Sequence, residues 1–226
     1  HVQLPGTDVT AHLAMDGVDL LDDVPDDLFA KHPLHGHVRA DMLEGMHLKY
    51  FVPDIDLRGQ YYVSADVSFT GTALFIPEFS LRFDDSYAYG ECSFTGLDQD
   101  QPYVELDLQN SAARYASVRK RLAFVPLPEL TFLGRTRLDR VKMKGFPQDS
   151  LWFEVHAEDT PGRADGTMTL YLNDTSLGYA VDMTVDHGDI AVFNGDQDLR
   201  TLINGHVTMR GRGLTAQDVS GRAEIS

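Results

Sequence analysis

Residues 141–186 read VKMKGFPQDSLWFEVHAEDTPGRADGTMTLYLNDTSLGYAVDMTVD, and this stretch decides the fold. Apolar and polar residues alternate in segments 151–156 (LWFEVH), 167–172 (TMTLYL) and 179–186 (YAVDMTVD). A period of two places the apolar and the polar side chains on opposite faces of a β-sheet. Turn-forming pairs such as Pro-Gly and Asn-Asp separate the segments, so the stretch predicts successive antiparallel strands.

The same pattern occurs about 75 residues earlier in the chain. Three elements correspond at offsets of 74, 76 and 75 residues: DVSFTG (66–71) with RVKMKG (140–145), Gly90 with Gly166, and Asp107 with Asp182. A third unit opens at TMRGRG (208–213). Repeats at a fixed period indicate stacked supersecondary units that extend one common core.

These repeats divide the chain into four parts. We predict an N-terminal β-strand segment over 1–62, a first β repeat over 63–133, a second over 134–204, and the start of a third over 205–226. Each full repeat is expected to end in a short helix, at about 111–122 and about 196–203. Segment 111–122 is rich in Ala, Arg and Lys and has no Gly or Pro, which favours a helix. Ser111 is predicted to cap the N-terminus of this helix.

The N-terminal segment has weaker signals. We predict a strand within residues 8–20 and one helical turn just before Pro33. Three short strands are expected after it: HVRADM (37–42), MHLKYF (46–51) and IDLRG (55–59).

Composition and charge restrict the classes of function. The chain holds 35 acidic and 19 basic residues, a net charge of −16, which disfavours nucleic acid as a partner and predicts a solvated acidic surface. No run of about 18 apolar residues is present that would predict a membrane-spanning helix. Cys92, the single cysteine, has no internal disulfide partner and reads as a small buried hydrophobe. Because the chain begins at His1 and ends in a strand-like pattern, we expect a segment of a longer or processed protein.

Motifs for catalysis are missing from the sequence. It holds no G-x-S-x-G, no H-E-x-x-H, no phosphate-binding loop and no dinucleotide fingerprint. We therefore predict no catalytic residues, no enzymatic activity and no cofactor.

Two weak metal patterns and one basic cluster also have ordinary structural explanations. His32, His35 and His37 lie close in sequence, but no Cys, Asp or Glu at ligand spacing completes a site. The run 194–198 (NGDQD) resembles the start of a calcium loop that lacks its glycine and its final glutamate. No metal is predicted. The cluster 119–121 (RKR) fits either anionic lipid headgroups or the C-terminus of a helix, and the helix terminus is favoured.

The apolar face of the predicted strands is the candidate site. It either packs on a second sheet, as in a sandwich, or curls into an open gutter that holds an apolar ligand. The candidate lining residues are Val67, Phe69, Phe79, Leu81, Phe83, Phe94, Val104, Leu106, Leu108, Phe153, Val155, Met168, Leu170, Val181, Met183, Val207 and Met209.

A family resemblance bears on this choice. The succession LPEL-TFLGRTRLDRVKMKGFPQDSLWFEVHAEDTPGRADGTMTLYL, GYAVDMTVDHGDIAVF and DLRTLINGHVTMRGRGLTAQDVSGRAEI resembles the periplasmic TamB/AsmA-like family, and looks most like members from the Bacteroidota lineage. The phrase G-x-h-x-h-x-G-x-G-L-T, in which h is apolar, stands at 205–215. The resemblance covers nearly the whole chain, through motifs that are loose.

The resemblance implies an all-β fold, an elongated antiparallel sheet curled into a β-taco with a hydrophobic groove. It also implies a periplasmic segment of a protein that is anchored in the inner membrane and reaches the outer membrane. Members are linked to phospholipid transfer, and to assembly of outer-membrane proteins with a barrel partner. The expected ligand is a phospholipid or another acyl-chain lipid, and no catalytic residues carry over.

Two other functions compete with a lipid conduit. One is a scaffold or chaperone module for outer-membrane protein assembly, which would bind a barrel partner or client strands. The other is a carbohydrate-binding or carbohydrate-degrading β-solenoid, for which the sequence offers only Trp152 and scattered tyrosines.

Overall fold

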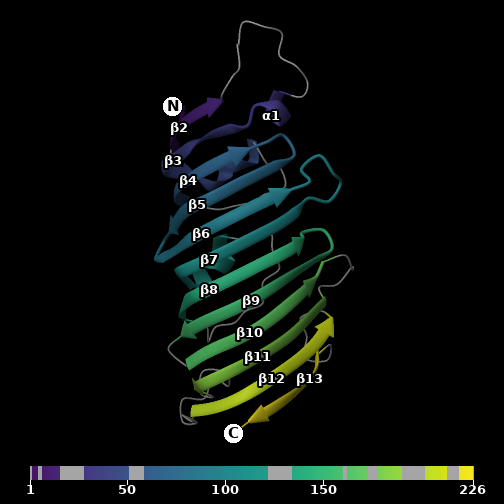
Figure 1. The fold of residues 1–226 in the computed structure, drawn as a ribbon. Helices are drawn as coiled ribbons and strands as arrows, with labels where there is room; N and C mark the ends of the chain where they lie inside the picture. Colours follow the sequence, from purple (N-terminus) through teal and green to yellow (C-terminus); the bar gives the residue numbers. More distant parts are fainter. Residues whose placement is uncertain are drawn as a thin grey trace, which may run out of the picture.

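The chain folds into one long antiparallel meander. The computed structural model describes residues 2–4, 7–15, 28–50, 59–121, 134–159, 162–172, 178–189, 202–212 and 219–225. They form a 13-stranded sheet in which each strand pairs with the one before it, in the order β1 to β13 (Figure 1). The strands are β1 (Val2–Leu4), β2 (Thr7–Met15), β3 (Leu34–Glu44), β4 (Gln60–Phe69), β5 (Ala73–Phe83), β6 (Ser86–Thr95), β7 (Tyr103–Arg114), β8 (Arg135–Phe146), β9 (Ser150–Asp159), β10 (Gly162–Tyr171), β11 (Gly178–Asp189), β12 (Leu202–Arg212) and β13 (Val219–Ile225).

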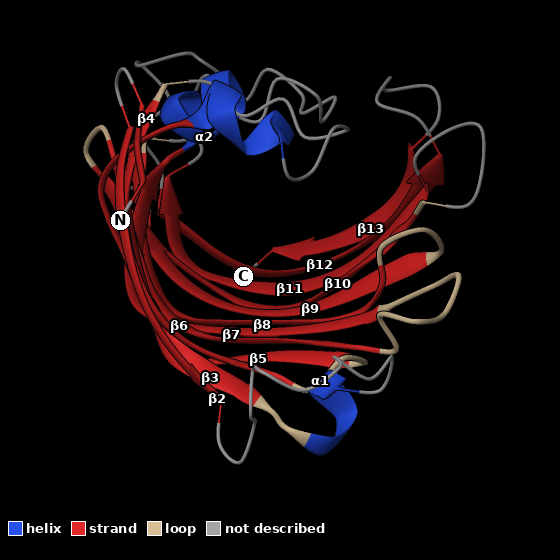
Figure 2. Ribbon diagram, turned by 90° about the horizontal axis from the view of Figure 1, so that it is seen from above, coloured by secondary structure: helices blue, strands red, loops and turns tan. Residues whose placement is uncertain are grey.

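The sheet is curled but not closed. Figure 2, which looks along the stack of strands, shows each long strand bent into an arc around a concave side. The first and last strands end the sheet at opposite ends of the stack, and no second sheet packs on it among the described residues. The predicted all-β curled open sheet is therefore confirmed, and the described residues do not form the sandwich alternative.

The two sequence repeats occupy equivalent places in the meander. Strands β4–β7 form the first four-strand unit and β8–β11 form the second. Gly90 lies in the third strand of its unit, as Gly166 does, and Asp107 lies in the fourth, as Asp182 does. The architecture is therefore repeat-like at the level of strands.

The first predicted helix is present but shorter than expected. Helix α2 spans Tyr115–Arg121, whereas residues 111–114 belong to β7 and pair with β8. Ser111 is not a helix cap: it is fully buried, accepts a hydrogen bond from the Tyr89 N–H at 3.0 Å and donates one to the Gln109 carbonyl at 3.1 Å. It stabilises an irregular place in β7, where Asn110 has a positive φ of 47°. Strand pairing thus outweighs the helix propensity of these residues.

The other short elements agree only in part with the prediction. Helix α1 spans Leu28–Lys31, just before Pro33, as predicted. Segment 46–51 was expected to be a strand, and this is wrong, because Gly45–Tyr50 forms the 3₁₀ helix η1. Strand β3 already pairs with β4, so residues between them have no free strand to join. The predicted helix at 196–203 lies mostly outside the described residues, and its last two residues instead begin β12.

Glycines permit the bend of the strands. A Cβ on Gly90 would lie 2.1 Å from the Asp107 carbonyl oxygen, and a Cβ on Gly166 would lie 2.1 Å from the Asp182 carbonyl oxygen. Gly90 pairs with Leu108 and Gly166 pairs with Met183, so both glycines lie in one row that crosses the sheet. Only a residue without a side chain allows neighbouring backbones to approach this closely. The matched glycines of the two repeats therefore permit the same close approach of neighbouring backbones at equivalent places in the sheet.

Few apolar side chains are fully buried. The buried hydrophobic residues are Leu28, Ala40, Tyr61, Ala65, Ala73, Val104, Ala112 and Ala157. Most of them are alanines, which remove little apolar area from water. The backbone ladder between strands, more than a closed core, must therefore hold the described part of the chain together.

Candidate functional site

All seventeen predicted lining residues lie on one face of the sheet, which we call the inner face. The alternation within each strand and the pairing between strands fix this placement, because directly paired residues share a face. Tyr61 and Phe83 contact each other on the inner face, and α2 packs on Tyr61. Because α2 lies within the arc in Figure 2, the inner face is the concave face of the sheet. Contact of these residues with lipid stays a prediction.

A continuous apolar row runs across the inner face from β5 to β12. Its members pair one after another in the order Ile76, Cys92, Leu106, Met143, Phe153, Met168, Val181 and Met209. Seven strand spacings of about 4.8 Å give the row a length of about 34 Å. The row follows the axis of the gutter, at right angles to the strands.

Sequence reasoning missed part of this lining. The residues that share the inner face with the predicted ones include Leu74, Ile76, Cys92, Val141, Met143, Leu151 and Tyr179. The signal was present for β8, because Val141 and Met143 alternate with lysines. Ile76 was harder to assign, because the pairing of β5 shifts register after it, next to Pro77.

The side chains of the inner face are partly exposed, as expected for an open concave surface. Sixteen of the seventeen predicted residues are partly exposed, and only Val104, at 5% exposure, is buried. A second sheet would cover such residues, whereas a convex surface would leave them fully exposed. The inner face is therefore apolar and still accessible. Soluble proteins rarely leave such a continuous apolar surface open without a ligand or partner for it.

Helix α2 is fastened to one rim of the arc by a buried cation. The Arg121 side chain donates to Asp84 at 2.5 Å, and its guanidinium carbon lies 5.3 Å from the centre of the Tyr61 ring. The hydrogen bond from Arg121 lowers the pKa of Asp84 and raises that of Arg121, while burial raises the pKa of Tyr61. Arg114 makes a second bridge, at 2.5 Å, to Asp85 in the same turn.

The basic cluster at 119–121 therefore divides into two roles. Arg121 is buried against Tyr61 and Asp84, as suits a cation at a helix C-terminus. Arg119 and Lys120 are exposed at the rim.

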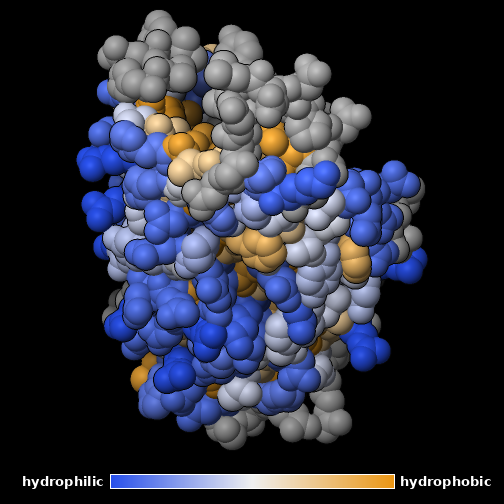
Figure 3. Space-filling view, turned by 45° about the horizontal axis from the view of Figure 1, so that its top comes forward, coloured by the Kyte–Doolittle hydropathy of each residue, from blue (hydrophilic) through white to orange (hydrophobic). Residues whose placement is uncertain are grey.

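The opposite face, which we call the outer face, is polar. Figure 3 shows it mostly hydrophilic, with hydrophobic groups near the top of the view and a further patch near its middle. Cross-strand ion pairs cover it: His37–Asp66, Arg140–Asp107, Arg137–Glu158, Lys142–Glu154, His156–Asp165 and His206–Asp182. Hydrogen bonds from Arg140 and from Arg163 lower the pKa values of Asp107 and Asp165, respectively.

The metal patterns find no support in the described part of the chain. His37 Nδ1 lies 2.7 Å from Asp66, and its Nε2 lies 3.2 Å from Ser64 Oγ, so it belongs to the outer-face network. No three metal-ligating side chains come together among the described residues. The calcium-like run 194–198 lies outside them. Cys92 is half-buried, and burial raises the pKa of its thiol.

Comparisons with known proteins add no assignment. No protein-family model, no curated protein and no solved structure matches the chain. Among the described helices, none is long and apolar enough to cross a membrane.

Proposed function

We propose that this chain is a segment of a TamB/AsmA-like, periplasm-spanning protein, whose inner face conducts phospholipids between the inner and the outer membrane. One observation carries the proposal: the continuous, partly exposed apolar row from Ile76 to Met209 on the concave side of an open sheet. The resemblance to that family supplies the periplasmic setting and the class of cargo.

The size of the row suits sliding better than tight binding. One leaflet of a bilayer is about 15 Å thick in its hydrocarbon part, about half the length of the row. Moving a two-chain phospholipid through water exposes roughly thirty methylenes at about 0.8 kcal/mol each, on the order of 25 kcal/mol. A uniform apolar lining offsets much of this cost at every position. The free energy of a bound acyl chain therefore has no deep minimum along the row.

The lining also suits cargo of variable shape. Met143, Met168, Met183 and Met209 line the inner face from β8 to β12. Methionine side chains are flexible and polarisable, and they adapt to different apolar partners. The open side of the arc leaves a headgroup in water while the acyl chains contact the sheet.

The test is the recovery and exchange of lipid by the purified protein. We expect organic extracts to contain co-purified phospholipid, and we expect a fluorescent phospholipid to bind saturably. Photo-crosslinkers at Leu106 and Phe153 should give lipid adducts. Protein adducts without lipid would instead support the scaffold function for outer-membrane protein assembly. Neither co-purified lipid nor probe uptake would contradict the proposed function.

A further inference from the structure

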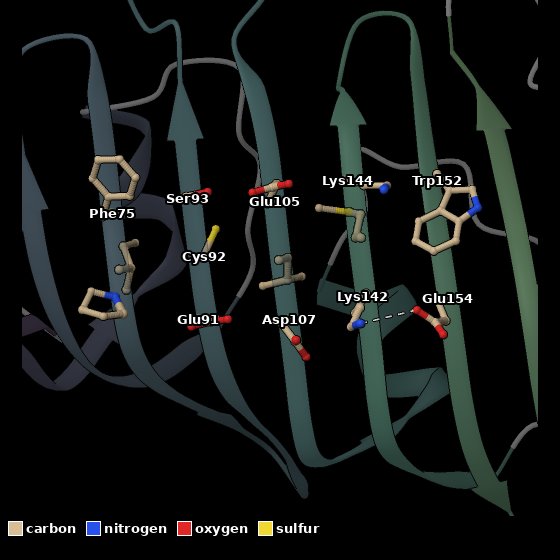
Figure 4. A pocket seen from close by; sticks show the side chains of 14 residues that line it. Phe75, Glu91, Cys92, Ser93, Glu105, Asp107, Lys142, Lys144, Trp152 and Glu154 are labelled. Carbon is tan, nitrogen blue, oxygen red and sulfur yellow. Dashed lines mark ion pairs between the residues drawn. The ribbon is translucent and has the colours of Figure 1, made fainter.

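The outer face has a hollow that the lipid function does not use. It has a volume of about 610 Å³ and crosses the sheet from β5 to β9. Figure 4 shows the side chains that line it. Charged and aromatic side chains from five neighbouring strands line it on the outer face, and the row residues Ile76, Cys92, Leu106 and Met143 contribute to its lining between them.

Aromatic rings stand at the two ends of the hollow. Phe75, on β5, is 42% exposed, and Trp152 lies on β9. Both rings appear broad side on in Figure 4, so each presents a flat face. Phe75 and Trp152 belong to one row of paired residues, through Ser93, Glu105 and Lys144. Four strand spacings of about 4.8 Å separate them by about 19 Å.

The space between the rings carries both acceptors and donors of hydrogen bonds. Glu91 and Glu105 are exposed carboxylates on β6 and β7. Lys142 lies 3.7 Å from Glu154, and the Lys144 ammonium lies 4.9 Å from the centre of the Trp152 ring. Ionised carboxylates accept several hydrogen bonds each and ammonium groups donate three.

We propose that this outer hollow binds a linear oligosaccharide. A sugar ring has an apolar C–H face, which suits the electron-rich face of an aromatic ring, and a rim of hydroxyl groups that donate and accept hydrogen bonds. A ring at each end, with carboxylates and ammonium groups between, matches several linked sugars laid across the strands.

Other ligand classes fit less well. Glu91, Glu105 and Asp107 repel the phosphates of nucleic acids. Lys142 and Lys144 repel a polyamine from the half of the hollow next to Trp152. An acyl chain would have to desolvate all these charged groups.

The chain offers a direct probe, because Trp152 is its single tryptophan. We expect titration with chitohexaose or cellohexaose to shift or quench the Trp152 emission saturably, with at least one of the two binding in the millimolar range or tighter. Phe75→Ala and Glu105→Gln should each weaken binding by about fivefold or more. Tyr171→Ala, an exposed outer-face change outside the hollow, should leave the affinity unchanged.

Several results would overturn the proposed oligosaccharide site. No change in emission with either sugar up to about 10 mM, or a response to spermine alone, would remove the oligosaccharide site. Equal binding by wild type, Phe75→Ala and Glu105→Gln would do the same. Trp152 lies on the face opposite to the apolar row, so this result is independent of lipid binding. Failure here leaves the lipid proposal standing, and failure of lipid binding leaves this one standing.

Discussion

The two faces of this sheet share one backbone and differ in nearly everything else. On β7, Leu106 points into the concave side, whereas its neighbours Glu105 and Asp107 line the hollow on the outer face. Many charges of the outer face pair across strands, as in Arg140–Asp107 at 2.5 Å. The inner face has apolar side chains that remain partly exposed. This contrast is why we propose an apolar ligand for the inner face and a polar ligand for the outer hollow.

The comparison also shows how a chain of this kind stays folded. A sandwich gains its stability from burying two apolar faces against each other. Here the large apolar residues of the inner face stay half-exposed, and alanines dominate the buried set. Strand pairing and the ion pairs that hold α2 at its rim must therefore contribute more than usual to the free energy of unfolding.

The largest expected effect is from a charge on the inner face. Leu106→Glu should weaken binding of a fluorescent phospholipid by about a hundredfold, because an acyl chain would have to desolvate the carboxylate. The fold should survive, because in the lipid-free protein the open face leaves the new carboxylate in water. Circular dichroism and lipid titration measure the two properties.

A matched control separates the effect of the added charge from the effect of the face that carries it. Gln109→Glu adds the same charge on the same strand but on the outer face, and lipid affinity should be unchanged. Equal loss of lipid binding in both variants would erase the distinction between the faces. Unfolding of Leu106→Glu would instead indicate that the inner face is an ordinary core.

The second effect concerns the glycines that shape the arc. Gly166→Ala should lower the free energy of unfolding by about 2–3 kcal/mol, because its Cβ meets the Asp182 carbonyl oxygen and the neighbouring backbone must shift. Gly178→Ala should cost less than about 1 kcal/mol, because its Cβ would first meet the Tyr171 side chain at 3.2 Å. Urea denaturation of the two variants measures the difference. Similar losses would show that Gly166 does not set the bend.

A smaller effect is expected at the rim. Arg121→Ala should lower the free energy of unfolding by about 1.5–2 kcal/mol, because it leaves Asp84 without its charged hydrogen bond and Tyr61 without its cover. Arg163→Ala, on the outer face with its side chain 56% exposed, should cost less than about 1 kcal/mol. Thermal denaturation of both variants measures the two losses of stability. A larger loss for Arg163→Ala would contradict the fastening of α2.

The smallest effect is a dependence on acid. Asp84 and Asp107 have pKa values below the ordinary 3.8 in the folded chain, because arginines donate hydrogen bonds to them. Their contribution to stability is therefore complete above about pH 4 and is lost as the pH falls through the lowered values. Asp107→Asn should flatten the stability profile below pH 4 in denaturant melts. An unchanged profile would show that the outer-face pair contributes nothing to acid sensitivity.

Much of the fold could be predicted from alternation and repetition. The period of two fixed which side chains share a face, and the matched glycines of the repeats, Gly90 and Gly166, proved equivalent in the sheet. Alternation within a strand carries no information on whether an apolar face is covered. The openness of the sheet therefore needed the structure, or the family resemblance, to be anticipated.

Local competition explains the errors. Residues 111–114 favour a helix by composition, but β8 offers them a strand partner. The segment around Gly45–Tyr50 alternates like a strand, but no neighbouring strand is left for it. The outer hollow could not be predicted from the sequence, because Phe75 and Trp152 are 77 residues apart and only the register of five strands places them in one row of the outer face.

Two adjacent positions test the central claim most directly. Trp152 faces outward and Phe153 faces inward on the same strand, so the double change Trp152→Phe, Phe153→Trp moves the single tryptophan from one face to the other. Phospholipid with brominated acyl chains should quench the emission of tryptophan at position 153 strongly and that of Trp152 hardly at all. Equal quenching at the two positions, or none at position 153, would contradict an inner face that holds acyl chains.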